Sequence, residues 1–77
     1  MRLVDAVYQR IVGYAKERNI SMNALATLGG VPRPTIVTMT RSKTVTLSTV
    51  YGVCEGLGIT LQEFFASPLF DKENIDD

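Results

Sequence analysis

The sequence SMNALATLGGVPRPTIVTMTR, residues 21–41, has the features of two short helices joined by a tight turn. Ser21 can cap the first helix, because its hydroxyl can accept a hydrogen bond from a backbone N–H that the first helical turn leaves without a partner. The apolar residues that would face inward on this helix are Leu25, Ala26 and Leu28. Gly29-Gly30 would end it, since one of these glycines can take the positive φ angle that a tight turn between crossing helices needs.

Residues 31–50 fit two kinds of structure. Residues 35–40 and 44–50 are rich in β-branched side chains and partly alternate in polarity, which by propensity favours a hairpin that turns at residues 41–43. A lone two-stranded hairpin is only marginally stable in water, however, and Pro32 and Pro34 suit the first turn of a helix, where a missing N–H donor costs little. These points favour a helix over residues 33–40, and a partly stranded stretch within residues 35–50 is the alternative.

An amphipathic helix precedes this stretch of sequence. Apolar side chains recur at intervals of three and four residues, which places them on one face of a helix. They are Val4, Val7, Tyr8, Ile11, Val12 and Ala15. We expect this helix to end near Asn19, because asparagine tolerates the left-handed conformation that is common at helix C-termini.

Two more helices are expected after residue 45. Thr46 can cap the first of them and Gly58 can close it, and its apolar pattern consists of Leu47, Val50, Tyr51, Val53, Cys54 and Leu57. Thr60 and Glu63 have the spacing of a capping box, in which the two side chains satisfy two backbone N–H groups reciprocally. This box would open a short last helix with Leu61, Phe64 and Phe65. The sequence therefore predicts an all-α fold of five short helices.

Length and composition limit what the chain can be. A chain of 77 residues makes one domain, which we expect to cover residues 1–70, with an acidic tail that frays over residues 71–77. No apolar run approaches the roughly 18 to 20 residues of a membrane span, and no signal-peptide pattern opens the chain, so we expect a cytoplasmic protein. Cys54 is the one cysteine and histidine is absent, so neither a metal site nor another cofactor is expected.

The net charge is zero, but the charges are unevenly distributed. No acidic residue lies between Glu17 and Glu55, while that interval contains four basic residues: Arg18, Arg33, Arg41 and Lys43. Residues 1–70 carry seven basic and four acidic side chains, a net charge of +3, and the acids gather in residues 71–77. A mixed surface with an acidic tail and a surface that faces phosphates both fit this distribution.

Several residues fall at the spacing of one known family. They are Ser21, Leu25-Ala26, Gly30-Val31 and Thr35-Ile36, and further on Leu47, Thr49, Leu57-Gly-Ile-Thr-Leu61 and Glu63-Phe-Phe65. With them the sequence, from about Ile11 to Phe65, resembles the phage-repressor type of helix-turn-helix family, also called Cro-like or XRE. The resemblance implies a five-helix DNA-binding domain of a transcriptional regulator, and it favours a repressor over an activator. Members of that family commonly bind two-fold symmetric operators in double-stranded DNA as homodimers.

The resemblance also implies which residues would contact DNA. In such a motif the second helix of the pair enters the major groove. The predicted DNA-binding residues are Arg33, Pro34, Thr35, Val37, Thr38, Arg41, Lys43, Ser21 and Met22. Arg33 could donate two hydrogen bonds to a guanine, whereas Arg41 and Lys43 would contact phosphates; simple solvation of these side chains is the alternative. Ile36 and Met39 would face the core on the inner side.

Five positions depart from the family pattern. Met22 stands where glutamine is common, and methionine cannot donate a hydrogen bond to a phosphate. Pro32 and Pro34 replace small polar residues, Thr40 replaces an acidic residue, and Gly29 replaces a larger apolar one. A protein-interaction module on the same fold, with weak or no DNA binding, is therefore the second interpretation.

An enzyme is not expected from this sequence. It has no histidine, no nucleophile with a matching base and no glycine-rich loop of the phosphate-binding pattern. A small-molecule substrate is likewise not expected.

Overall fold

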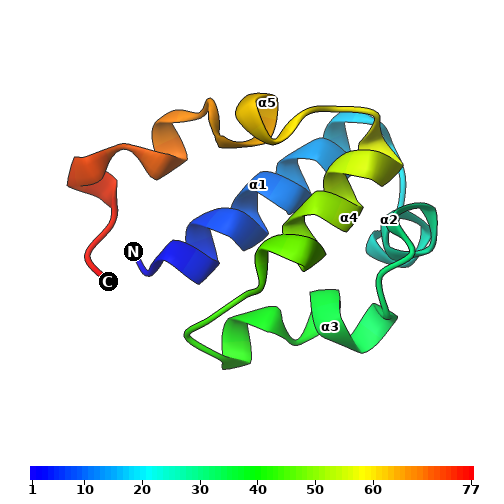
Figure 1. Ribbon diagram of the computed structural model, residues 1–77, viewed down its shortest axis with the longest axis horizontal. Coiled ribbons are helices and arrows are strands. Elements are labelled where there is room, and N and C mark those ends of the chain that lie inside the picture. The colour runs from blue at the N-terminus through cyan, green and yellow to red at the C-terminus, as the bar shows by residue number, and fades with distance from the viewer.

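Five α-helices and three 3-10 turns form the chain, and the computed structural model describes all 77 residues. The helices are α1 (Leu3–Glu17), α2 (Met22–Gly29), α3 (Arg33–Val37), α4 (Leu47–Leu57) and α5 (Leu61–Phe65). The turns are η1 (Met39–Arg41), η2 (Pro68–Phe70) and η3 (Lys72–Asn74). In Figure 1, α3 and η1 lie along one side of the molecule and α5 with the last two turns along the opposite side, with α1 and α4 between them. The prediction of an all-α fold with five helices is confirmed.

Side chains cap three of the helices as the sequence predicts. The hydroxyl of Ser21 accepts a hydrogen bond from a backbone N–H of α2 at 3.0 Å, and that of Thr46 does the same for α4 at 3.3 Å. Thr60 and Glu63 form both hydrogen bonds of the capping box, each 3.0 Å long. These bonds satisfy backbone donors that a helix N-terminus leaves free, so each helix begins at the predicted position.

The chain turns through the left-handed region at three helix ends. Asn19 has a φ angle of 55° after α1, Gly30 one of 64° after α2, and Gly58 one of 70° after α4. Of the glycine pair predicted to end α2, Gly30 is the one that takes the positive φ angle. Gly29 is the last residue of α2 and has a different reason to be glycine.

The helix after the turn is shorter than the sequence predicts. We expect a helix over residues 33–40, but α3 ends at Val37 and a separate 3-10 turn follows at Met39–Arg41. Thr38 donates both its backbone N–H and its hydroxyl to the carbonyl of Pro34, at 3.0 and 2.6 Å. A hydroxyl that bonds to the backbone within the same turn competes with regular helix, which fits the break at this residue. No residue between 35 and 50 is in a strand, so the hairpin alternative is wrong.

A single hydrophobic core receives side chains from all five helices and from η1. Its 13 buried residues are Val4, Val7, Ile11, Ala15, Leu25, Ala26, Ile36, Met39, Val50, Val53, Cys54, Leu57 and Phe64. Ile36 and Met39 face the core as expected, which fixes the orientation of α3 and η1 about their own axes. Cys54 is buried, and this burial raises the pKa of its thiol above the usual range.

Three apolar residues that the helical spacing predicts to be buried are exposed instead. Leu28 is 58% exposed, Leu47 70% and Tyr51 52%. Leu47 opens α4 and Tyr51 follows one turn later on the same face, which no other element covers. Leu28 lies beside Gly29, where α2 presents its backbone rather than a side chain to α4. The periodicity therefore identifies the helices correctly but makes their buried faces too wide.

Glycines allow α2 and α4 to approach until their backbones touch. A Cβ atom on Gly29 would lie 2.6 Å from the carbonyl oxygen of Gly52, and a Cβ atom on Gly56 would lie 2.7 Å from the backbone nitrogen of Gly29. A Cβ atom on Gly52 would lie 2.9 Å from a methyl group of Val31. Gly29, Gly52 and Gly56 therefore form a glycine contact between the two helices, and backbone atoms cannot yield to a methyl group as a flexible side chain can.

No helix in the structure combines the length and the apolar character that crossing a membrane requires. The structure also holds no group of three or more acidic or cysteine side chains that could bind a metal ion.

Candidate nucleic-acid interface

The helix-turn-helix consists of α2, the turn at residues 30–32, and α3. Two backbone hydrogen bonds close the turn, from Gly30 to Thr27 at 3.2 Å and from Val31 to Ala26 at 3.0 Å. Ala26 is 2% exposed, so a larger side chain there would have no room. The glycine contact holds α2 against α4, and buried Ile36 holds α3 against the core. The angle at which α3 projects is thus set by buried and backbone contacts.

The outer face of α3 carries most of the predicted DNA-binding residues. Arg33, Pro34 and Thr35 are exposed, and Val37 is 49% exposed. The Arg33 side chain makes no hydrogen bond or ion pair within the chain and is free to meet an external partner. Thr38 is only partly exposed, and because its hydroxyl donates to Pro34, it can offer a partner an acceptor but not this proton.

The loop after η1 presents two further basic side chains. Arg41 and Lys43 are exposed, and neither makes a hydrogen bond or ion pair within the chain. Between them, the Ser42 hydroxyl accepts a hydrogen bond from the backbone N–H of Thr44 at 3.2 Å, which forms a local turn. We call residues 33–43, which comprise α3, η1 and this loop, the recognition segment. All three of its basic side chains are unpaired.

Three arginines in α1 and at its two caps, by contrast, bond within the chain. Arg10 donates to the carbonyls of Phe64 and Glu63 at the end of α5, at 2.8 Å each, and Arg18 donates to the carbonyl of Leu57 at the end of α4. Arg2 donates to the carbonyl of Thr40 in η1. Cations at helix C-termini satisfy carbonyls that lack helical partners. The sequence gives no sign of this use, because the partners lie 38 or more residues away along the chain.

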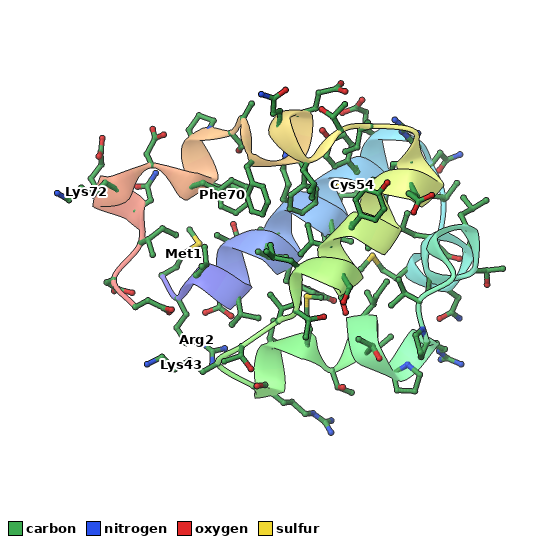
Figure 2. The ribbon with its side chains drawn as sticks, in the orientation of Figure 1. Met1, Arg2, Lys43, Cys54, Phe70 and Lys72 are labelled. Carbon is green, nitrogen blue, oxygen red and sulfur yellow. The ribbon has the colours of Figure 1, made fainter.

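These internal bonds change where free positive charge lies. Five basic side chains make no hydrogen bond or ion pair within the chain: Lys16, Arg33, Arg41, Lys43 and Lys72. Three of the five belong to the recognition segment, which contains no acidic residue. Figure 2 shows Lys43 on the side of the molecule formed by η1, and Lys72 on the side formed by the C-terminal turns. A surface with several free cations and no anion suits a polyanionic partner.

The two predicted residues at the start of α2 differ in exposure. Ser21 is exposed, and its hydroxyl oxygen already accepts the capping hydrogen bond from Ala24. Met22 is half-buried and packs against the hydrophobic core. Ser21 therefore keeps a hydroxyl proton for a partner, whereas Met22 contributes packing at this end of α2.

The sequence matches the family model of the Cro/C1-type HTH DNA-binding domain over residues 10–67. The matched range contains α2, α3, η1, α4 and α5 together with half of α1. Comparison with curated proteins and with solved structures gives no significant match.

Proposed function

Because the chain belongs to the family of Cro/C1-type HTH DNA-binding domains, we propose that it is a transcriptional repressor that reads double-stranded DNA with α3 in the major groove. The observation that carries the proposal is the state of its basic side chains. Arg33, Arg41 and Lys43 are exposed and unpaired in one segment of eleven residues, while the arginines of α1 and of its two caps are bonded to the chain itself. Free cations beside an exposed helix are what groove binding needs.

Each side chain of the recognition segment has a proposed role. The Arg33 guanidinium lies in the first turn of α3, the end that enters the groove in this motif, where it would donate to O6 and N7 of a guanine. Val37 lies one turn later and would contact a thymine methyl group. Arg41 and Lys43 follow α3 and would bind phosphates, which positions the protein without reading sequence. Ser21 would donate its hydroxyl proton to another phosphate.

We further propose that two copies bind a two-fold symmetric operator. α3 has only five residues, so one copy reaches few base pairs, and a dimer doubles the contact and fixes the spacing of half-sites. Residues 1–70 would form the DNA-binding domain, with residues 71–77 as an appended tail, and the protein would act in the cytoplasm.

A salt titration tests the proposal. We expect binding of a mixed-sequence duplex to weaken with salt, with a log-log slope of about −0.9 for each phosphate contact. Arg41→Ala should make the slope shallower by about 0.9, which is the contribution of one phosphate contact. Lys72→Ala removes the same charge from the far side of the molecule and should leave the slope unchanged. If the wild type retains no duplex even at low salt, the proposal is wrong and a protein-interaction module becomes the better interpretation.

A further inference from the structure

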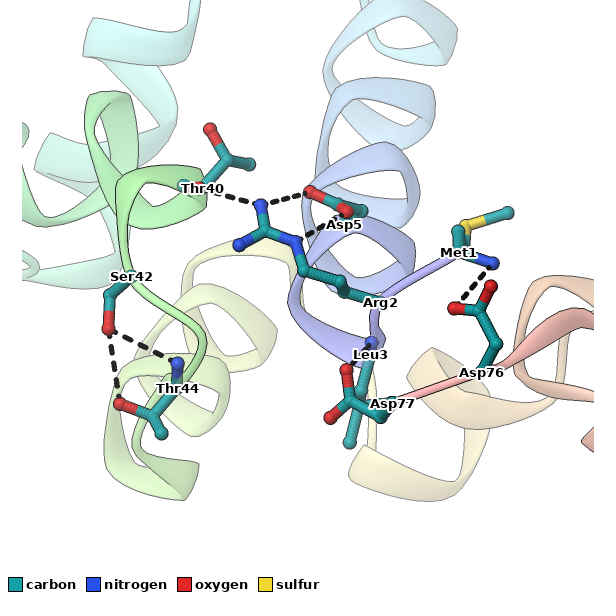
Figure 3. Close-up of polar contacts among 9 residues, drawn as sticks. All are labelled: Met1, Arg2, Leu3, Asp5, Thr40, Ser42, Thr44, Asp76 and Asp77. Carbon is teal, nitrogen blue, oxygen red and sulfur yellow. Dashed lines mark hydrogen bonds and ion pairs between the residues drawn. The ribbon is translucent and has the colours of Figure 1, made fainter.

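Arg2 joins the start of α1 to the middle of the recognition segment. Its guanidinium donates two parallel hydrogen bonds to the carboxylate of Asp5, from Nε and Nη2, each 2.9 Å long. The same Nη2 donates to the carbonyl oxygen of Thr40 at 2.7 Å. Figure 3 shows these three bonds, with the guanidinium between α1 and η1. A bidentate pair with a carboxylate fixes the plane of the guanidinium, so the bond to Thr40 has a defined direction.

The carbonyl of Thr40 has no other partner in the chain. The backbone N–H groups of Arg41 and Ser42 donate to the carbonyls of Thr38 and Met39, and no backbone N–H donates to the carbonyl of Thr40. Beyond Met39, which is buried, every residue up to Thr44 is exposed or partly exposed. The Arg2 bond is therefore the one hydrogen bond by which a side chain from another element holds the backbone between Met39 and the loop.

We infer that Arg2 is a positioning residue for DNA binding: held by Asp5, it fixes the backbone at Thr40 and so aims the adjacent Arg41 and the loop that carries Lys43. This inference rests on the proposed function. Arg10 and Arg18 bond to the ends of α5 and α4 instead, so they stabilise the fold without touching the recognition segment. Arg2 and Asp5 are only partly exposed, with 42% and 31% of their side-chain surfaces accessible. The Arg2 hydrogen bonds also lower the pKa of the Asp5 carboxyl, as expected for a carboxylate held in its charged form.

Asp5→Asn separates positioning from charge, because the two effects have opposite signs. Removing a negative charge beside a phosphate-binding surface would by itself strengthen DNA binding. Loss of the bidentate pair frees the guanidinium and lets the backbone at Thr40 move, which weakens binding. Ordering a mobile segment on binding has an entropic cost, so we expect the affinity to fall about twofold to twelvefold. The salt slope should stay unchanged, since no phosphate contact is removed.

Arg2→Lys is the second variant, and Glu17→Gln is the matched control. Lysine keeps the positive charge, but its single nitrogen cannot make the two bonds to Asp5 and the bond to Thr40 at the same time. The affinity of Arg2→Lys should therefore fall by a factor similar to that of Asp5→Asn. Glu17 is exposed at the other end of α1, and its replacement makes the same charge change as Asp5→Asn without touching Arg2. It should bind as the wild type does, or slightly more tightly.

The measurement is duplex affinity at several salt concentrations, under conditions where circular dichroism shows every variant fully folded. A purely structural role for Arg2 would lower the melting temperature but leave the affinity of the folded protein unchanged. Amide hydrogen exchange gives an independent readout, since residues 41–44 should exchange faster in Asp5→Asn and Arg2→Lys. If the wild type binds DNA and Asp5→Asn binds as tightly or more tightly, the inference is overturned and the proposed function stands. If the wild type binds no duplex, both are overturned.

Discussion

The α2–α4 contact and the recognition segment are neighbours in the fold but are built on opposite principles. At the first, Gly29, Gly52 and Gly56 bring backbone against backbone, and a single methyl group would lie within 3 Å of a heavy atom. At the second, α3 rests on buried Ile36 while Arg33 and Val37 project into solvent without partners. The first region thus depends on the absence of side chains, and the second, which carries the proposed DNA contacts, depends on side chains that are free. Substitutions in the α2–α4 contact should therefore change the stability of the fold, and substitutions in the recognition segment should change the affinity for DNA.

Gly56→Ala should have the largest effect on stability. The new Cβ atom would lie 2.7 Å from the backbone nitrogen of Gly29, so one helix must shift. Overpacking of this kind costs about 1 to 3 kcal/mol, and we expect the upper part of that range because the obstacle is backbone. Urea denaturation followed by circular dichroism measures the change.

Gly13→Ala is the control for Gly56→Ala. Gly13 is also inside a helix, but a Cβ atom there would meet nothing within 4 Å. Alanine is preferred to glycine in helices by about 0.5 to 1 kcal/mol, so this variant should gain stability. The glycine contact would lose its assigned role if Gly56→Ala were as stable as Gly13→Ala.

Arg33→Ala and Arg10→Ala should have opposite profiles. Arg33 is unpaired, so its loss should cost about 1 to 3 kcal/mol of discrimination for the preferred duplex and little stability. Arg10 donates to two carbonyls at the end of α5, so its loss should lower the free energy of unfolding by about 1.5 to 3 kcal/mol, the range for hydrogen bonds to a charged group. The folded Arg10→Ala protein should bind DNA as the wild type does. Equal loss of affinity in both variants would contradict the separation of the two regions.

Ser21→Ala should sharpen the comparison, because Ser21 belongs to both regions. Loss of the cap on α2 should cost about 1 kcal/mol of stability. The proposed phosphate contact should disappear as well, so the affinity of the folded variant should fall and its salt slope should decrease. Ser21→Gly removes the hydroxyl while costing less helix stability, and it should show the same loss of affinity. Full affinity in both variants would assign Ser21 to the scaffold alone.

Acidification should have the smallest effect. The pKa of Asp5 is lowered from its usual value of 3.8 by the hydrogen bonds from Arg2. A carboxyl whose pKa is lower in the folded state contributes stability above its unfolded pKa, and this contribution is lost as the pH falls through the folded value. Below pH 3.8 the wild type should therefore lose stability more steeply than Asp5→Asn. Parallel acid-unfolding curves for the two proteins would show that the Arg2–Asp5 pair contributes nothing.

Features that depend on nearby residues could be predicted from the sequence, and those that depend on distant contacts could not. The caps at Ser21, Thr46 and Thr60 and the ends at Asn19 and Gly58 follow from residues within one turn, and all are confirmed. The role of Gly29 against α4 requires knowing which helices touch, so the sequence suggests only a turn.

The same distinction holds for the candidate site. The exposed residues of α3 follow from helical spacing once Ile36 is turned inward. The internal use of Arg2, Arg10 and Arg18 could not be predicted, because their acceptors are carbonyls far along the chain. The break after Val37 could not be predicted either, since β-branched side chains obscure where a short helix ends.

Selection of bound sequences from a random duplex pool, with the wild type and Arg33→Ala in parallel, tests most directly whether the recognition segment reads DNA. We predict that the wild type enriches a two-fold symmetric site containing a guanine in each half-site. Arg33→Ala should keep its salt-dependent binding but lose the preference for that guanine. This prediction is contradicted if the wild type enriches no sequence, or if both proteins enrich the same one.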